Sequence, residues 1–480
     1  MDAPVTTKSD FSVDSHLQSA AELRQNTRTL GERVGWTEER TDFDSSCRMF
    51  SNSGYGYDTA NPGIIVRPNN SLRRIEMSFH AHSPLFLCFM LLVAASRFLS
   101  AAEDASQPIL RSEFVFPLHP QHNHAPGIAE LADGELIVSW YRGSGERTAD
   151  DVAVYGSRLK AGRKEWGPEF LMTDTPGFPD CNTAMMTDPN GRLMLFWPVV
   201  IANSWESCLT HLKVSDNPAG DGCPQWDRSE TILLKPDDFS PEAIRILDQF
   251  LSALPVPLPE KQKLEIEEAK EKLSQKLYQR MGWQPRCKPT VLPSGRILLP
   301  LYTDTFSISI MAISDDGGST WYASKPLLGF GAIQPAVLRR DDGTLVAYMR
   351  ENGFTGHVRV CESTDDGVTW GPVGVSELVN PGSGLDGVRL RNGHWVLVHN
   401  DTSSGRNQLA VSLSTDEGLT WKASRHLEQQ PTGSFHYPCV IQAKDGMIHA
   451  VYSYFCDEGK TMKHAAFNED WILTGDVVPK

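Results

Sequence analysis

The stretch Ser314-Asp-Asp-Gly-Gly-Ser-Thr-Trp321 returns twice later in the chain, as Ser363-Thr-Asp-Asp-Gly-Val-Thr-Trp370 and Ser414-Thr-Asp-Glu-Gly-Leu-Thr-Trp421. All three copies fit Ser-x-Asp-x-Gly-x-Thr-Trp, and their starts lie about 50 residues apart, a period typical of stacked sheet units. In such a phrase Asp and Gly form a turn, Ser and Thr bond the local backbone, and Trp buries a large ring between sheets. We therefore expect these boxed turns to be structural rather than catalytic or calcium-binding.

A second repeat runs between the boxed turns. Two-residue turns that end in glycine are each followed by an apolar segment, which is the pattern of a β-hairpin. The six turns are Asp133-Gly134, Asn190-Gly191, Ser294-Gly295, Asp342-Gly343, Asn392-Gly393 and Asp445-Gly446. Six such hairpins predict an all-β domain over residues 110–480, folded as a six-bladed β-propeller.

One interval in this series indicates an insertion, because Gly191 and Gly295 lie roughly twice as far apart as the other neighbouring turn glycines. Ser240 followed by Pro241 is a helix start, and residues 260–281 are rich in Glu, Lys, Leu and Gln. The sequence therefore predicts a helical insertion at 237–283 in the third blade. Its role is either a solvated decoration or a lid or partner surface.

The N-terminal part of the chain does not read as part of the propeller. Residues 1–76 are polar without sustained periodicity, and we expect a disordered segment or an over-extended gene start. Residues 77–102 contain an apolar run of about 12 residues and then small residues, as a signal peptide does. The run is short for a membrane span, so we expect export, periplasmic or secreted, with no stable span. A signal-anchor is the alternative if translation begins at Met1.

Composition excludes several kinds of partner and cofactor. The net charge is −15 at neutral pH, without a basic stripe, so we expect no nucleic acid partner. His122 and His124 lie two apart on a predicted strand and would point to opposite faces, and the nine cysteines form no Cys-x-x-Cys pair. We therefore predict neither a metal site nor a cofactor.

Cationic residues recur where a propeller gathers its inner strands at one mouth of the central channel. They are Arg142, Lys288, Arg350 and Arg406. Guanidinium groups bind carboxylates in a bidentate manner, and here they would converge within an acidic protein. The sequence therefore predicts a pocket for an anionic ligand, an acidic sugar.

The boxed turns, the six-blade period and these inner-strand residues resemble the sialidase superfamily, and within it the bacterial sialidase-like proteins with BNR repeats. Sialidases hold the substrate carboxylate with three arginines, and they use a tyrosine nucleophile, an assisting glutamate and an aspartate acid/base. The resemblance implies that Arg350 and Arg406 are two of the three arginines. His124, in the phrase His124-Ala125-Pro126, stands where the family has the first arginine.

The resemblance also implies the catalytic residues. Tyr437 matches the nucleophile, whereas Gln334 stands at the position of the assisting glutamate and cannot take a proton from it. The candidates for the acid/base are Asp151, Asp150 and Glu146. Further residues expected to line the pocket are Arg142, Lys288 and Asp386.

Three hypotheses follow. The first is an exported exo-glycosidase that hydrolyses a terminal acidic sugar. Because His124 and Gln334 depart from the family pattern, the identity of that sugar, sialic-acid-like or related, is left open. The second is a polysaccharide lyase, in which Arg350 and Arg406 neutralise a uronate carboxylate while His124 or Tyr437 removes the neighbouring carbon proton. The third is a non-catalytic propeller that binds an acidic saccharide or glycoconjugate. The sequence does not indicate an oligomeric state.

Overall fold

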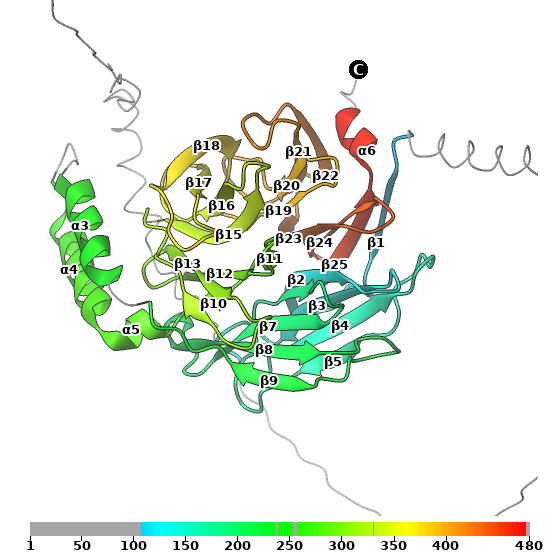
Figure 1. Ribbon diagram of the computed structural model, residues 1–480, viewed down its shortest axis with the longest axis horizontal. Coiled ribbons are helices and arrows are strands. Elements are labelled where there is room, and N and C mark those ends of the chain that lie inside the picture. The colour runs from blue at the N-terminus through cyan, green and yellow to red at the C-terminus, as the bar shows by residue number, and fades with distance from the viewer. Residues whose placement is uncertain (1–106, 237–238, 253–256, 330, 477–480) are drawn as a thin grey trace, which may run out of the picture. The chain divides into compact units, whose positions relative to one another are not determined.

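Six antiparallel sheets follow one another along the chain and are arranged as the blades of a propeller (Figure 1). The computed structural model describes residues 107–236, 239–252, 257–329 and 331–476. The expected N-terminal segment 1–76 and the expected signal peptide 77–102 lie outside the described residues. Within them the prediction of an all-β, six-bladed propeller is confirmed.

The first three blades have these strands, from the innermost outwards: β2 (His122–Glu130), β3 (Leu136–Gly143), β4 (Ala153–Leu159) and β5 (Phe170–Thr173); β6 (Ala184–Thr187), β7 (Leu193–Val200), β8 (Cys208–Ser215) and β9 (Arg228–Thr231); and β10 (Gln284–Pro285) with β11 (Thr290–Val291), β12 (Ile297–Thr303), β13 (Ile308–Ser314) and β14 (Tyr322–Ala323). Each turn glycine of the sequence precedes the second strand of its blade.

The remaining blades have these strands, in the same order: β15 (Ala332–Arg339), β16 (Leu345–Glu351), β17 (His357–Ser363) and β18 (Gly374–Val379); β19 (Asp386–Arg389), β20 (Trp395–His399), β21 (Gln408–Ser414) and β22 (Ala423–Gln429); and β23 (Ser434–Gln442), β24 (Ile448–Cys456), β25 (Gly459–Phe467) and β1 (Leu110–Phe114). The outermost strand of the last blade thus comes from the beginning of the described chain.

Helices are few. A 3-10 turn, η2 (Trp205–Ser207), precedes β8, and α6 (Glu469–Leu473) follows β25. The predicted insertion consists of α3 (Phe239–Ser252), α4 (Glu260–Ser274) and α5 (Lys276–Arg280). These helices lie between β9 and β10, so they occupy the connection from the second blade to the third. Phe239, Ala243 and Leu273 bury against the apolar core of these two blades, which anchors the insertion.

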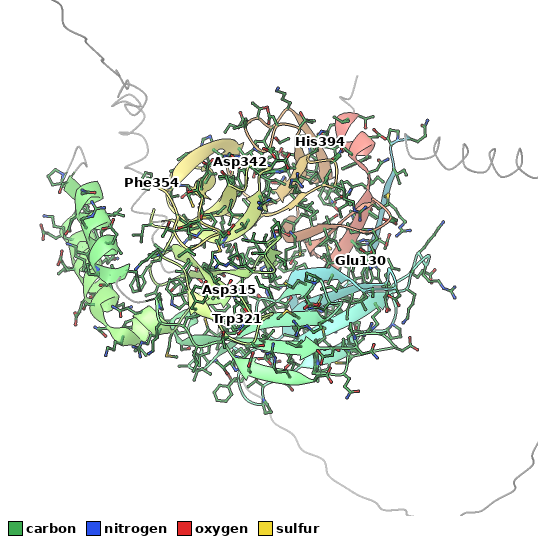
Figure 2. All side chains as sticks on the ribbon, viewed as in Figure 1. Glu130, Asp315, Trp321, Asp342, Phe354 and His394 are labelled. Atoms are coloured by element: carbon green, nitrogen blue, oxygen red, sulfur yellow. The ribbon has the colours of Figure 1, made fainter. Side chains whose placement is uncertain are left out.

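The core lies between neighbouring blades. Leu298 and Ile313 of the third blade, for example, pack in one buried cluster with Val337 and Leu345 of the fourth. The tryptophans of the boxed turns pack at the edges of such clusters, as Trp321 does (Figure 2). Alternate residues of each strand therefore face one neighbour or the other, and the ring buries both faces of every sheet.

The boxed turns have the structural role expected from the sequence. In the first copy, Ser314 Oγ donates to Asp316 Oδ1 over 2.8 Å and accepts from the amide of Gly318 over 2.8 Å. Asp316 also accepts from the amide and the hydroxyl of Thr320, at 2.8 and 2.6 Å. Trp321 Nε1 donates to the carbonyl of Gly318 at 3.1 Å. The bonds to Thr320 hold the pKa of Asp316 at about 2.

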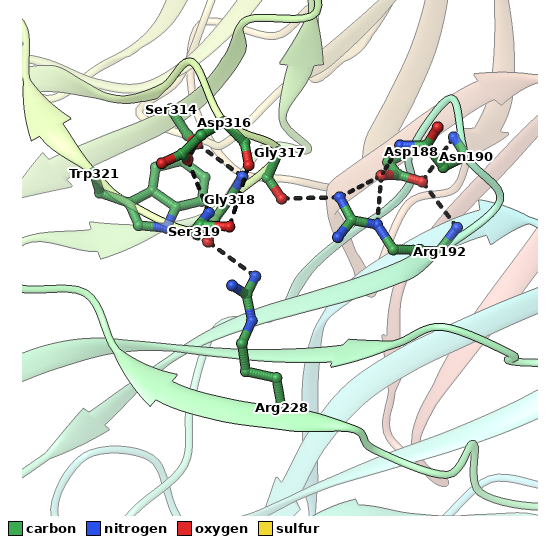
Figure 3. Close-up of polar contacts among 10 residues, drawn as sticks. All are labelled: Asp188, Asn190, Arg192, Arg228, Ser314, Asp316, Gly317, Gly318, Ser319 and Trp321. Carbon is green, nitrogen blue, oxygen red and sulfur yellow. Dashed lines mark hydrogen bonds and ion pairs between the residues drawn. The ribbon is translucent and has the colours of Figure 1, made fainter.

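Arginines of the preceding blade bind to these turns (Figure 3). Arg192 donates to the carbonyl of Gly317, and Arg228 donates to the carbonyl of Gly318, each over 2.9 Å. The device repeats, because Arg296 of the third blade donates to the carbonyl of Asp366 and Arg340 of the fourth donates to that of Glu417. The boxed turns thus tie successive blades together.

Asp316→Ala is expected to destabilise the propeller by about 1–2 kcal/mol, because several local donors lose a charged acceptor at once. The midpoint of thermal unfolding should fall by a few degrees, as read by circular dichroism. Asp221→Ala is the matched control, since that side chain is 95% exposed and within the described chain forms an ion pair with Lys160 alone. Equal midpoints for the two variants would contradict a structural role for the boxed aspartate.

His426 on β22 connects the fifth blade to the residues after α6. Its ring lies 3.0 Å from the carboxylate of Asp401 and 2.5 Å from that of Asp476. The hydrogen bond with Asp401, followed by that with Asp476, outweighs burial and raises the pKa of His426 to about 9. An unfolded histidine titrates near ~6.5, so this contribution is complete below about pH 6.5 and is lost as the pH rises through about 9.

His426→Asn is therefore expected to lower the thermal midpoint at pH 6 and to change it little at pH 10. Thermal scans across this range check the prediction. His357→Asn is the control, because among the described residues the ring of His357 bonds the carbonyl of Thr355 and no carboxylate. A deficit of the His426 variant that is as large at pH 10 as at pH 6 would contradict the assignment.

Candidate functional site

The innermost strands of three blades share one backbone irregularity. Register shifts interrupt β2, β15 and β23, each at a proline. The residue before that proline has a positive φ, which is 51° at Ala125, 58° at Gln334 and 54° at Tyr437. Residues other than glycine rarely adopt this conformation, and a following proline restricts the backbone further, so the strain typically marks functional positions. At two of these bulges the side chains meet.

The phenol of Tyr437 lies at the centre of the site. Gln334 Nε2 donates to Tyr437 Oη over 3.1 Å, and Arg350 Nη1 donates to the same oxygen over 2.9 Å. The fifth blade closes one side, because a Cβ at Gly384 would lie 2.8 Å from both Gln334 Oε1 and Tyr437 Cδ1. The phenolic oxygen is thus held by two donors, one of them charged, which is an arrangement suited to stabilising negative charge.

Two further guanidinium groups lie against the ring of Tyr437. The Cζ of Arg286 is 4.8 Å from the ring centroid, and that of Arg406 is 5.8 Å from it. Arg286 donates to the carbonyl of Pro438 and Arg406 to that of Gly382, over 2.7 and 2.9 Å. Three arginines therefore surround one tyrosine.

These arginines lack anionic partners among the described residues, where their bonds are to carbonyl, amide and phenol groups. Nε and Nη1 of Arg286 and Nε of Arg350 are buried without a hydrogen-bond partner in the described chain. Burial, and then the charge of Arg350, lower the pKa of Arg406 despite the attraction of Tyr437. Buried positive charge without a counter-ion is unfavourable, so the site is built to receive an anion.

Histidines form the wall beside Tyr437. The ring of His124 stacks on that of Tyr437 at a centroid distance of 4.3 Å and an interplanar angle of 22°, and His436 lies edge-on to His124 at 4.8 Å. His124 Nδ1 is 2.8 Å from Ser453 Oγ. Burial, followed by neighbouring histidines and arginines, holds the pKa of His124 well below its usual value. The imidazole is therefore neutral and available to exchange a proton or bind a hydroxyl.

The three predicted acid/base candidates occupy different surroundings. Glu146 accepts from the hydroxyl of Tyr141 over 2.7 Å and lies 3.3 Å from His122 Nε2, next to the histidine wall. Burial raises the pKa of Glu146, but the bonds with His122 and Tyr141 outweigh it and the net shift is downwards. Asp150 and Asp151 are exposed and have loop partners, Asn203 for the first and Ser144 for the second.

Three predicted lining residues have partners elsewhere. Arg142 donates to both carboxylate oxygens of Glu169, and its guanidinium lies 4.7 Å from the ring of Phe116. Lys288 pairs with Asp386 over 2.8 Å, and Asp386 also accepts from the amide of Val440 over 2.9 Å. The lysine and aspartate neutralise each other and connect inner strands of three blades, and the structure does not bring Arg142 to the group around Tyr437.

Sequence reasoning missed four residues of the site: Asn182, Arg286, Tyr302 and Asp304. Tyr302 Oη accepts from Asn182 Nδ2 over 3.2 Å. A usable signal existed, because Tyr302 follows Gly295 at the same distance as Arg350 follows Gly343. Arg286 belongs to the same phrase as Lys288, but only the lysine was predicted to face the ligand.

Two kinds of feature are absent from the described residues. No group of three or more histidine, cysteine, aspartate or glutamate side chains there is arranged to hold a metal ion. None of the helices in that part of the chain combines the length and apolar character that crossing a membrane requires.

The chain is similar in sequence to proteins with BNR repeats and to sialidases. Residues 275–450 match the model of the BNR repeat-like domain. A sialidase of Micromonospora viridifaciens is 28% identical over 174 residues, which cover 34% of this chain and 26% of that protein. An anhydrosialidase of Macrobdella decora is 27% identical over 188 residues, with 34% of this chain and 24% of that protein covered. The chain thus spans about a quarter of the length of these curated relatives.

A solved structure resembles the whole propeller. The Hadza microbial sialidase Hz136 aligns with a TM-score of 0.57 at 17% identity, over 75% of this chain and 69% of that one. At this identity the likeness shows the fold.

Proposed function

We propose, since the chain is a sialidase-like BNR-repeat protein, that it hydrolyses the bond to a terminal acidic sugar bound beside Tyr437. One observation carries this proposal: three guanidinium groups, that of buried Arg286 and those of half-buried Arg350 and Arg406, surround a single phenol and have no carboxylate partner among the described residues. A sugar carboxylate supplies the missing counter-ion, and bidentate pairing fixes its orientation.

Tyr437 is the nucleophile in this proposal. Its Oη attacks the anomeric carbon as the hydroxyl proton leaves to solvent, and the donors on Arg350 and Gln334 stabilise the negative charge that develops on that oxygen. Sialidases are a known tyrosine exception among glycosidases that otherwise use two carboxylates. Gln334 therefore acts as a donor that positions the phenol and does not act as a base.

The contacts of His124 support a role different from that of the arginine which the family has at this position. His124 is neutral and stacked on Tyr437, so it packs beside the sugar and offers a hydrogen bond to a hydroxyl, while Arg286 contributes the third positive charge. Glu146, Asp150 and Asp151 remain candidates for proton transfer to the leaving group. Export is part of the proposal and depends on the apolar run at 84–95.

A second function is favoured by one contact. A neutral imidazole stacked on a tyrosine beside carboxylate-binding arginines is also the equipment of a uronate lyase, in which a base removes the proton next to the carboxylate. Elimination leaves a carbon–carbon double bond that absorbs in the ultraviolet, whereas hydrolysis does not.

The test is a panel of aryl glycosides of sialic, ketodeoxy and uronic acids, together with a polyuronate, read for aryl release and for ultraviolet absorbance. Aryl release from an acidic glycoside without new absorbance supports hydrolysis, and absorbance from the polyuronate supports the lyase. Calorimetric binding of an acidic sugar with neither signal would contradict both and leave a binding propeller.

A further inference from the structure

The third blade contributes a carboxyl group that the family resemblance does not assign. Asp304 follows β12 directly, two residues after Tyr302. Its Oδ2 accepts from Gln284 Nε2 over 3.0 Å, and Gln284 Oε1 accepts from Asn182 Nδ2 over 2.9 Å. Asn182 Nδ2 in turn reaches Tyr302 Oη over 3.2 Å. Asp304 is therefore fixed to the inner strands of the second and third blades.

Hydrogen bonds connect the loop that carries Asp304 to the reaction centre. Arg350, whose Nη1 bonds Tyr437 Oη, also donates to Asn352 Oδ1 over 3.4 Å, and Asn352 Nδ2 donates to Ser307 Oγ, three residues after Asp304, over 2.8 Å. Asp304 is only partly buried, and Gln284 supplies its one hydrogen bond in the described chain. Its other carboxyl oxygen, Oδ1, thus accepts no hydrogen bond from the described chain.

We propose that Asp304 is the catalytic acid that protonates the leaving group, an assignment that rests on the proposed hydrolysis. In the first step the electron pair of Tyr437 Oη forms a bond to the anomeric carbon. The glycosidic C–O bond breaks, its electron pair stays with the leaving oxygen, and that oxygen takes the proton of Asp304.

In the second step the carboxylate of Asp304 takes a proton from water, whose oxygen bonds to the anomeric carbon. The bond to Tyr437 breaks and its electron pair returns to Oη. The hydroxyl proton of Tyr437 leaves to solvent as Oη attacks and returns from solvent as the bond to Oη breaks, and the net change is addition of water to the glycoside.

The surroundings of Asp304 separate its role from that of Glu146. Burial raises the pKa of Asp304 against the opposing effects of Arg350, Arg147 and the bond from Gln284, and the negative charge of Glu146 adds to the rise. The net pKa shift of Glu146 is downwards. Two carboxyl groups shifted in opposite directions within one site are typical of an acid and a permanently ionised partner.

The experiment compares Asp304→Asn with the wild type on two glycosides of the acidic sugar that the wild type cleaves, one with a nitrophenyl and one with a methyl leaving group. A good leaving group needs no proton, whereas a poor one does, and general acid catalysis is worth about 10²–10⁴-fold. We expect kcat/KM of the variant to fall by at least about a hundredfold on the methyl glycoside and by less than about tenfold on the nitrophenyl glycoside. The alkaline limb of the pH profile should disappear for the methyl glycoside.

Two further variants keep the result interpretable. Asp304→Glu retains a carboxyl group and should recover part of the activity on the methyl glycoside, which separates lost acid from lost fold. Asp221→Asn removes an exposed carboxylate and should behave as the wild type. Equal losses on both glycosides, or a leaving-group dependence that appears instead in Glu146→Gln, overturn the assignment of Asp304 alone. A wild type that cleaves neither glycoside overturns the proposed function, and the assignment falls with it.

Discussion

Tyr437→Phe is expected to reduce turnover of an aryl glycoside of the acidic sugar by roughly a thousandfold or more, which corresponds to about 4 kcal/mol in the activation barrier. The substitution removes only the hydroxyl that receives donors from Gln334 and Arg350. The ring contacts with His124 and Arg286 remain, so the site should keep its shape. Binding of the free sugar should change by less than about tenfold, since the arginines that hold its carboxylate are intact.

Steady-state kinetics and titration calorimetry separate these two effects. Tyr322→Phe is the matched control, because it also removes a single hydroxyl, one that bonds Asp315 far from the site on the boxed turn. That variant should retain wild-type turnover. Unchanged kcat in Tyr437→Phe would remove the proposed nucleophile, and a loss of binding equal to the loss of turnover would make the hydroxyl a binding group.

Arg350→Gln should have the second-largest effect, a decrease in kcat/KM of roughly 10²–10³-fold, or about 3–4 kcal/mol. Arg350 donates to Tyr437 Oη, and in the proposal it also holds the sugar carboxylate. Hydrogen bonds to charged groups are worth about 1.5–3 kcal/mol each, so the loss of two accounts for this magnitude. Because the carboxylate is bound before the reaction and the phenolate is stabilised during it, KM should rise and kcat should fall.

The control for this variant lies in the same blade. Arg359 on β17 donates to the carbonyl of Gly374 and lies 3.7 Å from Glu351. Arg359→Gln should leave kcat/KM within about twofold of the wild type, because the partners of Arg359 are Gly374 and Glu351 and not Tyr437. The preference for the acidic sugar over its neutral amide should be lost in Arg350→Gln only. Retention of that preference would show that the arginine does not bind the carboxylate.

Local chemistry made the fold predictable. The boxed turns and the turn glycines each specify a hairpin through contacts within a few residues, as the bonds of Asp316 to Thr320 show, and the tally of such hairpins gives the number of blades. The helical insertion was visible in spacing and composition, but its exact place was not. In the structure the insertion lies between β9, the last strand of the second blade, and β10, the first strand of the third. The sequence alone does not show whether an insertion lies inside a blade or between two blades.

The residues of the site were harder to predict than the fold, because neighbouring residues on a strand point to opposite faces of the sheet. Tyr141 on β3 lies opposite His124 on β2 and faces the site. Arg142, the next residue on β3, points the other way, towards Phe116 and Glu169. The sequence reading selected the cation and not its neighbour. Counting from the turn glycines, which places Tyr141, Tyr302 and Arg350 in equivalent positions, would have avoided this error.

Charge compensation was the other unpredictable element. Lys288 and Asp386 are separated by 98 positions in the sequence, yet they form an ion pair in the fold. Arg286, two residues before Lys288, has no such partner and lies instead over Tyr437. Which of two neighbouring cations faces a ligand depends on contacts across the ring, and these are absent from any local pattern.

The pairing of β1 with β25 has a consequence for biosynthesis. Ile109 donates its backbone N–H to the side chain of Asn468, 359 positions later in the chain. On the ribosome β1, the first strand of the described residues, must wait with its edge unpaired until β25 has emerged. The pair is antiparallel, with Leu110 opposite Phe467, so the chain enters β1 and leaves β25 at the same end of the seam. A force that pulls these two points apart therefore opens the backbone hydrogen bonds one after another, and the seam unzips from Leu110 and Phe467 inwards.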